Sequence, residues 1–368
     1  MLNPSYIIPK LPPAVDLETV PILKALNLAS RALADLKGQA KTIPNQGILI
    51  DTLSLQEAKA SSEVENIVTT QDELFQASLF PDNPQSPAAK EVALYRDALR
   101  LGFERLNATQ LIPNSALIEM FQLLKGRNEG FRTTPGTALK NEQTGAIVFV
   151  PPQDANEIVR QMTALEWFIN DDTLCNLDPL IKMALIHHQF ESIHPFSDGN
   201  GRIGRILNVL YLARTELLEI PILYLSRHIT RNKADYYRLL QAVRDTQGAA
   251  SAWEAWVLFI LQAVTETAYT TLKLVQGIRE QMAAMKIQMR SALSEIYSQD
   301  LLNNLFRHPY TRIEYVQRDL HITRQTAAKY LEKLATVGMV TKHQAGRNNY
   351  YINSTLVKLF LDVAEDLK

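Results

Sequence analysis

The sequence predicts a mainly α-helical protein, in which a helical domain with one β-hairpin is followed by a small winged helix-turn-helix domain. Three observations lead to this prediction. Apolar residues recur at helical spacing along most of the chain. Residues 128–153 break that spacing, with Gly and Pro around a short run of β-forming residues. After residue 300, the order of elements and the balance of charge both change.

Composition sets the outer limits. The chain has 368 residues, which is enough for two domains of about 100–200 residues each. Hydrophobic residues make up 46%, and the net charge of −1 excludes a polycation that binds nucleic acid over its whole surface. The single cysteine, Cys175, excludes a disulfide framework and favours a reducing compartment. The N-terminus has no basic start and no stretch of about 18 apolar residues occurs, so we expect a soluble, cytoplasmic protein with no membrane partner.

The N-terminal region is predicted to be an extended arm followed by a helix. Four prolines disfavour a helix at the start: Pro4, Pro9, Pro12 and Pro13. From Val15 the helical pattern takes over, with Asp16 as a candidate N-cap. We expect the apolar side chains of this helix to share one face, namely Val20, Ile22, Leu23 and Leu26.

The same periodicity predicts further helices along the chain. They cover residues 53–66, 87–107, 114–125, 154–170, 179–193, 201–217, 231–245 and 252–294. The last of these is long enough to pair with a second copy of the chain, so a homodimer is one expectation. Before the helix at 154, residues 146–150 are apolar and rich in β-formers, which predicts a β-hairpin of the kind that often serves as a functional flap.

The C-terminal region is predicted to be a helix-turn-helix followed by a hairpin. Helices are expected over 310–320 and 323–337, with strand-like residues at 340–343 and 349–353. Residues 301–353 hold eight Lys and Arg, at 307, 312, 318, 324, 329, 333, 342 and 347, against three acids, at 314, 319 and 332. This is the pattern of a winged helix-turn-helix, and DNA bound through 301–353 is one partner that it could have. Contact with proteins, or dimerisation, is the alternative.

The stretch that carries chemistry runs from His194 to Arg205 and reads His-Pro-Phe-Ser-Asp-Gly-Asn-Gly-Arg-Ile-Gly-Arg. An apolar helix over 180–193, capped by Asp178, precedes it, and Pro195 disfavours continuation of that helix. His194 is therefore expected at the C-terminal end of a helix, in a fixed position. A neutral imidazole there is a candidate general base.

The residues after this histidine suit an anion. Gly199 and Gly201 flank Asn200, so the backbone can turn tightly with its N–H groups pointing inward, which is a nest that binds anions. The next helix adds N–H donors and a partial positive charge at its N-terminus. Arg202 and Arg205 share one face of its first turn, and both can bind phosphate oxygens.

Asp198 precedes the nest, where it could hold a Mg²⁺ that bridges phosphates. A base, a metal carboxylate, an anion nest and two arginines are together suited to transfer of a phosphorus centre from a polyphosphate. The stretch has no Walker A lysine, so it is not a P-loop. His187 and His188 raise the alternative of a metal site with His194. Adjacent helical residues point about 100° apart, so we expect these two to pack against or support the site.

This stretch resembles the signature of the Fic-domain family, HPFx(D/E)GNGRxxR, at every fixed position, and the resemblance covers roughly residues 50–265. It implies a Fic-type helical fold and transfer of AMP from ATP, with Mg²⁺, to a Tyr, Ser or Thr hydroxyl of a target protein. His194 resembles the family's general base, and Asp198 resembles its Mg²⁺ ligand. The implied nucleotide-binding residues are Asp198, Gly199, Asn200, Gly201, Arg202, Ile203, Gly204 and Arg205.

Two other segments resemble parts of the same family. Residues 146–152 resemble the flap that holds the target's backbone by strand addition, which implies contacts from Ile147, Val148 and Phe149. An ordinary hairpin is the alternative. Residues 232–237 resemble the segment beside the adenine pocket, with Tyr236 as the contact. An aromatic pair on a helix also suits core packing.

Upstream, the segment Ser61-Ser-Glu-Val-Glu-Asn66 resembles the family's inhibitory motif, (S/T)xxxE(G/N). The resemblance implies that Glu65 pairs with Arg205, the second arginine of the signature. An arginine held by a carboxylate cannot hold a γ-phosphate, so ATP would bind in an unproductive pose. We therefore expect an adenylyltransferase that Glu65 holds inactive.

Other functions remain open at this point. The same site could remove AMP or transfer another phosphate-containing group, and the chain could instead be a DNA-binding regulator with the Fic domain as a sensor. In either case we expect four regions. They are an N-terminal arm and helix over 1–50, a Fic domain over 51–265 with the inhibitory helix near 61–66, a helical connector over 266–300, and a winged helix-like domain over 301–368.

Overall fold

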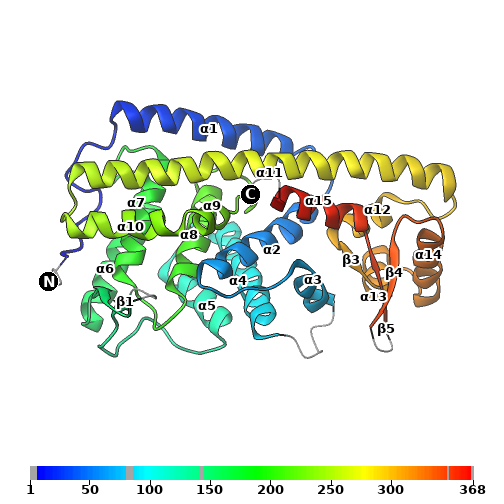
Figure 1. Cartoon of the computed structure of the whole chain (residues 1–368), viewed down its shortest axis with the longest axis horizontal. Coiled ribbons are helices and arrows are strands. Elements are labelled where there is room, and N and C mark those ends of the chain that lie inside the picture. Colours follow the sequence, from blue (N-terminus) through cyan, green and yellow to red (C-terminus); the bar gives the residue numbers. More distant parts are fainter. Residues whose placement is uncertain (1–5, 80–85, 141–143, 346–347, 366–368) are drawn as a thin grey trace. The chain divides into compact units, whose positions relative to one another are not determined.

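The computed structural model describes residues 6–79, 86–140, 144–345 and 348–365 (Figure 1). The chain divides into two compact units, each built from several segments. Unit 1 comprises Met1–Ala34, Glu57–Val68 and Leu94–Ala268, and unit 2 comprises Asp35–Gln56, Thr69–Ala93 and Tyr269–Lys368. The architecture is mainly helical with small antiparallel sheets, which confirms the predicted fold class.

Unit 1 is built around two helices that are buried almost all round. Helix α7 (Pro179–Ile193) buries every residue from Leu180 on, and α8 (Asn200–Arg214) packs against it. A helix that is apolar on all sides is stable only when other elements cover it completely. The elements that lie wholly or partly in unit 1 are α1 (Val20–Ala40), α2 (Gly47–Val64), α4 (Pro87–Thr109), α5 (Asn114–Lys125), α6 (Ala155–Asn170), α9 (Ser226–Arg231), α10 (Lys233–Asp245) and α11 (Ala250–Ala292).

The predicted hairpin is present in unit 1. Strand β1 (Leu139–Lys140) pairs antiparallel with β2 (Ile147–Phe149), with Leu139 opposite Phe149. Residues 141–143 lie outside the described part of the chain. Asp154 then caps α6, because its side chain accepts a hydrogen bond from the Glu157 N–H at 2.8 Å.

Unit 2 holds the C-terminal segment Tyr269–Lys368 and two earlier segments. Its wholly contained elements are α3 (Gln71–Leu79), α12 (Gln299–Arg307), β3 (Tyr310–Thr311), α13 (Ile313–Leu320), α14 (Arg324–Thr336), β4 (Thr341–Ala345), β5 (Asn348–Ile352) and α15 (Ser354–Glu365). The strands form one antiparallel sheet in the order β3-β5-β4. Thr323 caps α14 by accepting a hydrogen bond from the Thr326 N–H. The two predicted helices and the hairpin are thus present, and Arg347 lies outside the described residues.

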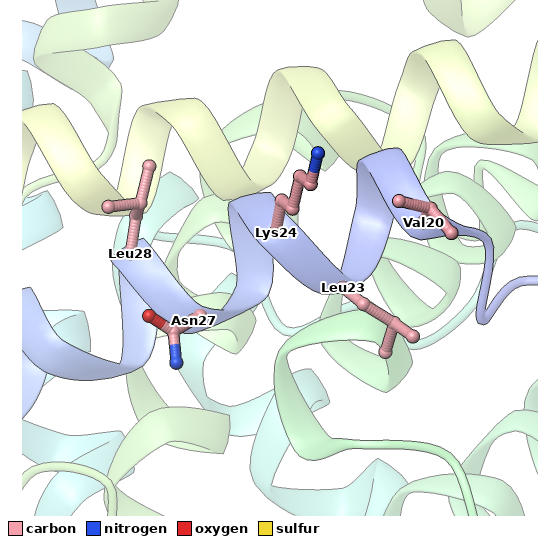
Figure 2. Close-up of a pocket in the computed structure, with 5 residues that line it drawn as sticks. All are labelled: Val20, Leu23, Lys24, Asn27 and Leu28. Atoms are coloured by element: carbon pink, nitrogen blue, oxygen red, sulfur yellow. The ribbon is translucent and has the colours of Figure 1, made fainter.

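Several sequence-based boundaries are wrong. Helix α1 begins at Val20 and not after Asp16, whose side chain accepts a hydrogen bond from Glu18 N in the preceding turn. Its apolar residues do not share one face, since Ile22 is buried whereas Val20 and Leu23 are 65% and 44% exposed. The exposed side lines a shallow hollow on α1, formed by Val20, Leu23, Lys24, Asn27 and Leu28 (Figure 2).

Two other helices differ from their predicted bounds. The helix expected over 231–245 is divided at Asn232, and the helix expected over 310–320 begins only at Ile313. Tyr310 and Thr311 instead pair with β5, because they complete the three-stranded sheet. Helices α3, α9, α12 and α15 were not expected.

Within the described residues, no helix has both the length and the apolar composition that a membrane span requires.

Candidate active site

The predicted general base lies where the sequence suggests. His194 is the C-cap of α7, in the left-handed region with φ 51° and ψ 59°, and its N–H donates to Phe190 O at 2.9 Å. Burial, together with the positive charges of Arg244 and Arg132, lowers the pKa of His194 to about 4. The imidazole is therefore neutral at pH 7, which is the form that can accept a proton.

The loop after His194 is closed by one side chain. Asn200 Oδ1 accepts from Phe196 N at 2.8 Å, and its Nδ2 donates to Phe196 O at 2.9 Å. Gly199, the N-cap of α8, has φ 74°, a conformation that L side chains rarely adopt. The amides of the first turn of α8 have no partners within the helix, so this end of α8 is suited to an anion.

Asp198, the predicted Mg²⁺ ligand, has a close cationic neighbour that the sequence did not indicate. Lys125 Nζ, from the last residue of α5, lies 2.6 Å from Asp198 Oδ2, and Gly199 N donates to Oδ1 at 2.6 Å. Burial alone would raise the pKa of Asp198, but the hydrogen bond and charge of Lys125 outweigh it and hold the pKa below its usual range. The carboxylate is thus ionised at neutral pH.

The donor set fits Mg²⁺ that arrives with a nucleotide. Over the described ranges, no group of three or more His, Cys, Asp or Glu side chains is placed to hold a metal ion. Mg²⁺ is commonly bound through one or two carboxylates together with phosphates and water. Asp198, whose side chain is 60% exposed, offers one such carboxylate.

Both signature arginines are buried on α8, and Arg205 has well-defined partners. Its Nε donates to Ser61 Oγ at 2.8 Å, and its Nη2 donates to Ser61 O at 2.9 Å and to Glu65 Oε1 at 2.8 Å. The structure therefore brings the segment 61–66, at the C-terminal end of α2, together with the second arginine of the signature. Arg202 is also buried, with its Nη2 beside Gly199.

The charges of this pair reinforce one another. Burial by itself would raise the pKa of Glu65, but the charge and hydrogen bond of Arg205 lower it overall. Burial by itself would lower the pKa of Arg205, but Glu65 raises it. Gly201 leaves the necessary room, since a Cβ at this position would lie 2.5 Å from Glu65 Oε1.

The buried carboxyl group of Glu57, about one helical turn before Ser61, holds α2 in place. Glu57 accepts hydrogen bonds from Tyr95 Oη at 3.0 Å, from Ser226 N at 3.2 Å and from Ser226 Oγ. Complete burial raises its pKa to about 7. These contacts join α2 to α4 and α9 within unit 1. These contacts were not predicted, because the three residues lie far apart along the chain.

The flap strand has one buried and two exposed members. Ile147 and Val148 are 37% and 41% exposed, so both are accessible to a partner. Phe149 is buried, with the Arg244 guanidinium 4.1 Å from its ring centroid and the Tyr6 ring edge-on at 6.2 Å. The flap is therefore attached to the domain through Phe149.

Arg132, just before the flap, is a further residue that was not singled out from the sequence. Its Nε donates to His194 O at 2.8 Å, and its Nη2 donates to Pro152 O and to Ile193 O. Its own N–H donates to Pro195 O at 2.8 Å. The only sequence signal was its place in the Gly- and Pro-rich segment over 128–153.

The remaining predicted residues pack around the site. Ile203 is buried, and Gly204 permits close approach of α7, since a Cβ there would lie 2.8 Å from Glu191 Oε1. Tyr236 is buried and its Oη lies 2.9 Å from His187 Nε2. The neighbouring Tyr237 is 42% exposed. A nucleotide contact of Tyr236 stays a prediction.

His187 and His188 have different surroundings. His187 contacts Tyr236 and stacks on the ring of Trp256, and His188 Nε2 lies 3.2 Å from Leu240 O. Complete burial lowers the pKa of His187 to about 3, so this ring is neutral. Both rings support the core behind the signature.

Three sequence profiles match the chain in order. One for the Fic/DOC family N-terminal region matches residues 23–104, and one for the Fic/DOC family matches residues 114–212. A third, described as the C-terminal domain of protein adenylyltransferase SoFic-like proteins, matches residues 281–356.

Relatives are similar over part of their length. A probable protein adenylyltransferase of Aquifex aeolicus is 27% identical over 206 residues, which are 55% of this chain and 57% of that protein. A protein adenylyltransferase Fic of Nematostella vectensis is 36% identical over 92 residues, which are 25% of this chain and 20% of that protein. The matched part thus spans little more than half of the first of these relatives.

Solved structures share the architecture. A Fic family protein from Desulfovibrio desulfuricans is similar with a TM-score of 0.55 and 20% identity, over 92% of this chain and 97% of that one. Fic-1 from C. elegans is similar with a TM-score of 0.51 and 18% identity, over 69% of this chain and 74% of that one. At these identities the likeness concerns the fold.

Proposed function

The chain belongs to the Fic/DOC family, and on this premise we propose that it is a protein adenylyltransferase, which transfers AMP from ATP to a Tyr, Ser or Thr hydroxyl of target proteins and of itself. One observation carries the proposal. A neutral His194 at the end of α7 stands next to a loop and helix N-terminus suited to phosphates, with two buried arginines behind it.

The chemistry follows from these positions. His194 removes the proton from the target hydroxyl as its oxygen attacks the α-phosphorus, and pyrophosphate leaves. Gly199, Asn200 and Gly201 hold the phosphates through main-chain N–H groups, and Arg202 and Arg205 hold the terminal ones. Asp198 would hold Mg²⁺, which supplies positive charge to the phosphates when bound.

The resting site is proposed to be held inactive by Glu65. Its carboxylate accepts a hydrogen bond from Arg205 Nη2, which the γ-phosphate would need. ATP can then bind only in a pose that turns the α-phosphorus away from the attacking hydroxyl. Replacing Glu65 by Gly removes the competitor and leaves the signature itself intact.

Labelled ATP tests the reaction. The Glu65→Gly chain is incubated with Mg²⁺ and either α-labelled or γ-labelled ATP, and protein-bound label is measured after denaturation. We expect label from the α-position only, and none in the Glu65→Gly, His194→Ala double variant. Label from the γ-position would show phosphate transfer instead. No label from either position would reject nucleotide and phosphate transfer alike.

Removal of AMP is a second proposal for the same site. The Glu65 side chain is 32% exposed beside Arg205, so its carboxylate could orient a water molecule towards a bound AMP group. Modified Glu65→Gly chain, freed of ATP, is mixed with unmodified wild type and Mg²⁺. Release of AMP when wild type is present, and none from the Glu65→Gly chain alone, would support removal. AMP that stays attached in the presence of wild type would exclude it.

DNA binding by unit 2 is the alternative of another class. Arg324, Gln325 and Lys329 are exposed on α14, as a recognition helix requires. Arg324 Nη1, however, pairs with Glu314 Oε1, which reduces the net positive charge of this face. A mobility shift of duplex DNA by the whole chain that falls steeply with salt would support binding. No shift at low salt would exclude it.

Two further expectations belong to the proposal as a whole. A cytoplasmic location, expected from the single cysteine, and a homodimer through 252–294 both remain predictions. Sedimentation of the whole chain over a range of concentrations tests the second of them. A single species with the mass of one chain at every concentration would exclude a stable dimer.

A further inference from the structure

Two buried arginines outside the signature connect the flap to the end of α7. Arg132 reaches both sides, since its guanidinium donates to His194 O at 2.8 Å and to Pro152 O, the carbonyl at the exit of the flap. It also reaches Ile193 O at 3.5 Å, and its main-chain N–H donates to Pro195 O. One residue thus contacts three consecutive carbonyls around the general base.

Arg244, on α10, makes the second connection. Its guanidinium carbon lies 4.1 Å from the ring centroid of Phe149, the buried residue of β2. Its Nε donates to Ser192 Oγ at 3.0 Å, two residues before His194. The flap is therefore joined to the last turn of α7 at both Phe149 and Pro152, from two different elements.

The buried charge of Arg132 is compensated by main-chain carbonyls. Arg132 is only 6% exposed, and placing a cation in such a site costs free energy unless it is well compensated. Carbonyls at the C-terminal end of a helix carry partial negative charge and are one such compensation. The planar guanidinium can bind several carbonyls at once in fixed directions, which a lysine ammonium cannot do.

We propose that Arg132 is a positioning residue, which fixes the His194 backbone relative to the flap so that a target strand paired with the flap presents its hydroxyl to the imidazole. This inference rests on the proposed adenylyl transfer. His194 has a left-handed backbone at φ 51°, a conformation that costs free energy for a non-glycine residue, and the Arg132 hydrogen bonds to residues 193–195 hold it there.

The same geometry has an electrostatic consequence. Arg244 and Arg132 each add positive charge near the His194 ring, and both act with burial to lower the pKa of His194. A substitution that removes the Arg132 charge should therefore raise the pKa of His194. A substitution that keeps the charge but loses the fork should leave the pKa near its original value and still disturb the placement of the ring.

Two variants and one matched control separate these effects. Arg132→Met removes charge and fork, and Arg132→Lys keeps the charge alone. Arg214→Met is the control, because the Arg214 side chain is only 9% exposed and its Nη2 also donates to a carbonyl at a helix end, Asn170 O at 2.6 Å, besides pairing with Asp172. All three substitutions are made in the Glu65→Gly chain. Thermal unfolding of each variant shows whether a loss of activity reflects a loss of stability.

The first measurement is the rate of self-modification at saturating ATP and the ATP concentration that gives half of it. We expect both Arg132 variants to lose about 10- to 100-fold in the saturated rate, as a misplaced catalytic group does. The half-saturating ATP concentration should stay unchanged, because Arg132 does not lie among the phosphate-binding residues. Arg214→Met should keep both values. A saturated rate equal to the parent's in both Arg132 variants would overturn the proposal.

The second measurement does not depend on activity. The His194 imidazole is titrated by NMR in the same chains, with His194→Ala for assignment. We expect its pKa to rise in Arg132→Met and to stay near the parent value in Arg132→Lys and Arg214→Met. An unchanged pKa in Arg132→Met would contradict the placement of Arg132 beside His194. If the parent chain transferred no AMP, the proposed function would fail, whereas this titration would still decide whether Arg132 acts on His194.

Discussion

At the residue scale, Arg205 has two competing sets of partners. In the structure, Glu65 Oε1 and two oxygens of Ser61 accept its hydrogen bonds, whereas in the proposed reaction a γ-phosphate needs the same N–H groups. Because Arg205 is buried, its side chain has no room to bind Glu65 and a γ-phosphate at the same time. A hydrogen bond to a charged group contributes about 1.5–3 kcal/mol, which corresponds to a change of about 10- to 100-fold when it is lost.

Ser61 should add a smaller share of this inhibition. Ser61→Ala removes the acceptor of Arg205 Nε and leaves the Glu65 pair in place. We expect self-modification by otherwise wild-type chain to rise about two- to tenfold, as fits one hydrogen bond of about 0.5–1.5 kcal/mol. Ser62→Ala is the control, because the buried Ser62 hydroxyl has no hydrogen-bond partner among the described residues. Equal rates for the two variants would remove Ser61 from the inhibitory contact.

His194 should stay a competent base well below its ordinary pKa of about 6.5. Burial and two arginines lower its pKa to about 4, so the imidazole binds a proton only near that pH. In the Glu65→Gly chain, the rate at low ATP should therefore stay constant as pH falls from 8 to about 5 and decline only below that. A decline centred near pH 6.5 would show that His194 is less buried than the structure has it.

At the scale of elements, α2 is the proposed regulatory element. Glu57 and Ser61 lie one turn apart on the helix and Glu65 follows at the same spacing just beyond its end, so all three point to one side. Glu57 anchors the helix to Tyr95 of α4 and Ser226 of α9, whereas Ser61 and Glu65 reach Arg205 of α8. A change that loosens the Glu57 anchor would thus also loosen the inhibitory contact.

The Glu57 anchor predicts how stability depends on pH. Burial raises the pKa of Glu57 to about 7, above the ordinary value of a glutamate, so the folded state keeps a proton that the unfolded state releases. Its stabilising contribution is complete below about pH 4.5 and is lost as pH rises to about 7, with a total on the order of 3 kcal/mol. Glu191, whose pKa burial also raises to about 7, adds a term of the same sign.

Glu57→Gln removes the contribution of Glu57 to the pH dependence of stability. His187 and His194, whose pKa values are lowered by burial, contribute with the opposite sign, so the prediction concerns the change in slope. Between pH 4.5 and 7, the free energy of unfolding should fall less, or rise more, with rising pH in Glu57→Gln than in wild type. Urea unfolding followed by tryptophan fluorescence measures this, because Trp167, Trp253 and Trp256 all lie in Leu94–Ala268. Glu63→Gln, on the same helix, is the control. Identical slopes for wild type and Glu57→Gln would contradict a neutral, buried Glu57.

At the scale of the whole molecule, the long helices and the signature were predictable because both are local. Helices such as Asn114–Lys125 and Pro179–Ile193 match their predictions, since their periodicity and caps are encoded within one segment. Short helices such as Gln299–Arg307 were missed, because two turns carry little periodic signal. The faces of Val20–Ala40 were wrong, because which side is buried depends on the elements that cover it.

In the candidate site too, local features were predictable and contacts between distant segments were not. His194 at a helix end and a tight turn at Gly199 could be predicted from the neighbouring residues. The pairing of Glu65 with Arg205 spans 140 residues and was expected only through resemblance. The Lys125, Glu57 and Arg132 contacts join distant segments, and no spacing along a single chain encodes them.

The most direct test of the account compares self-modification by wild type, Glu65→Gly and the Glu65→Gly, His194→Ala double variant. Each chain is incubated with ATP and Mg²⁺, and the mass of the intact protein is followed over time. Glu63→Gly, which makes the same substitution on α2 away from Arg205, serves as the control. The account predicts addition of AMP that is about 10- to 100-fold faster in Glu65→Gly than in wild type and Glu63→Gly, and none in the double variant. Equal rates in wild type and Glu65→Gly, or AMP addition without His194, would contradict it.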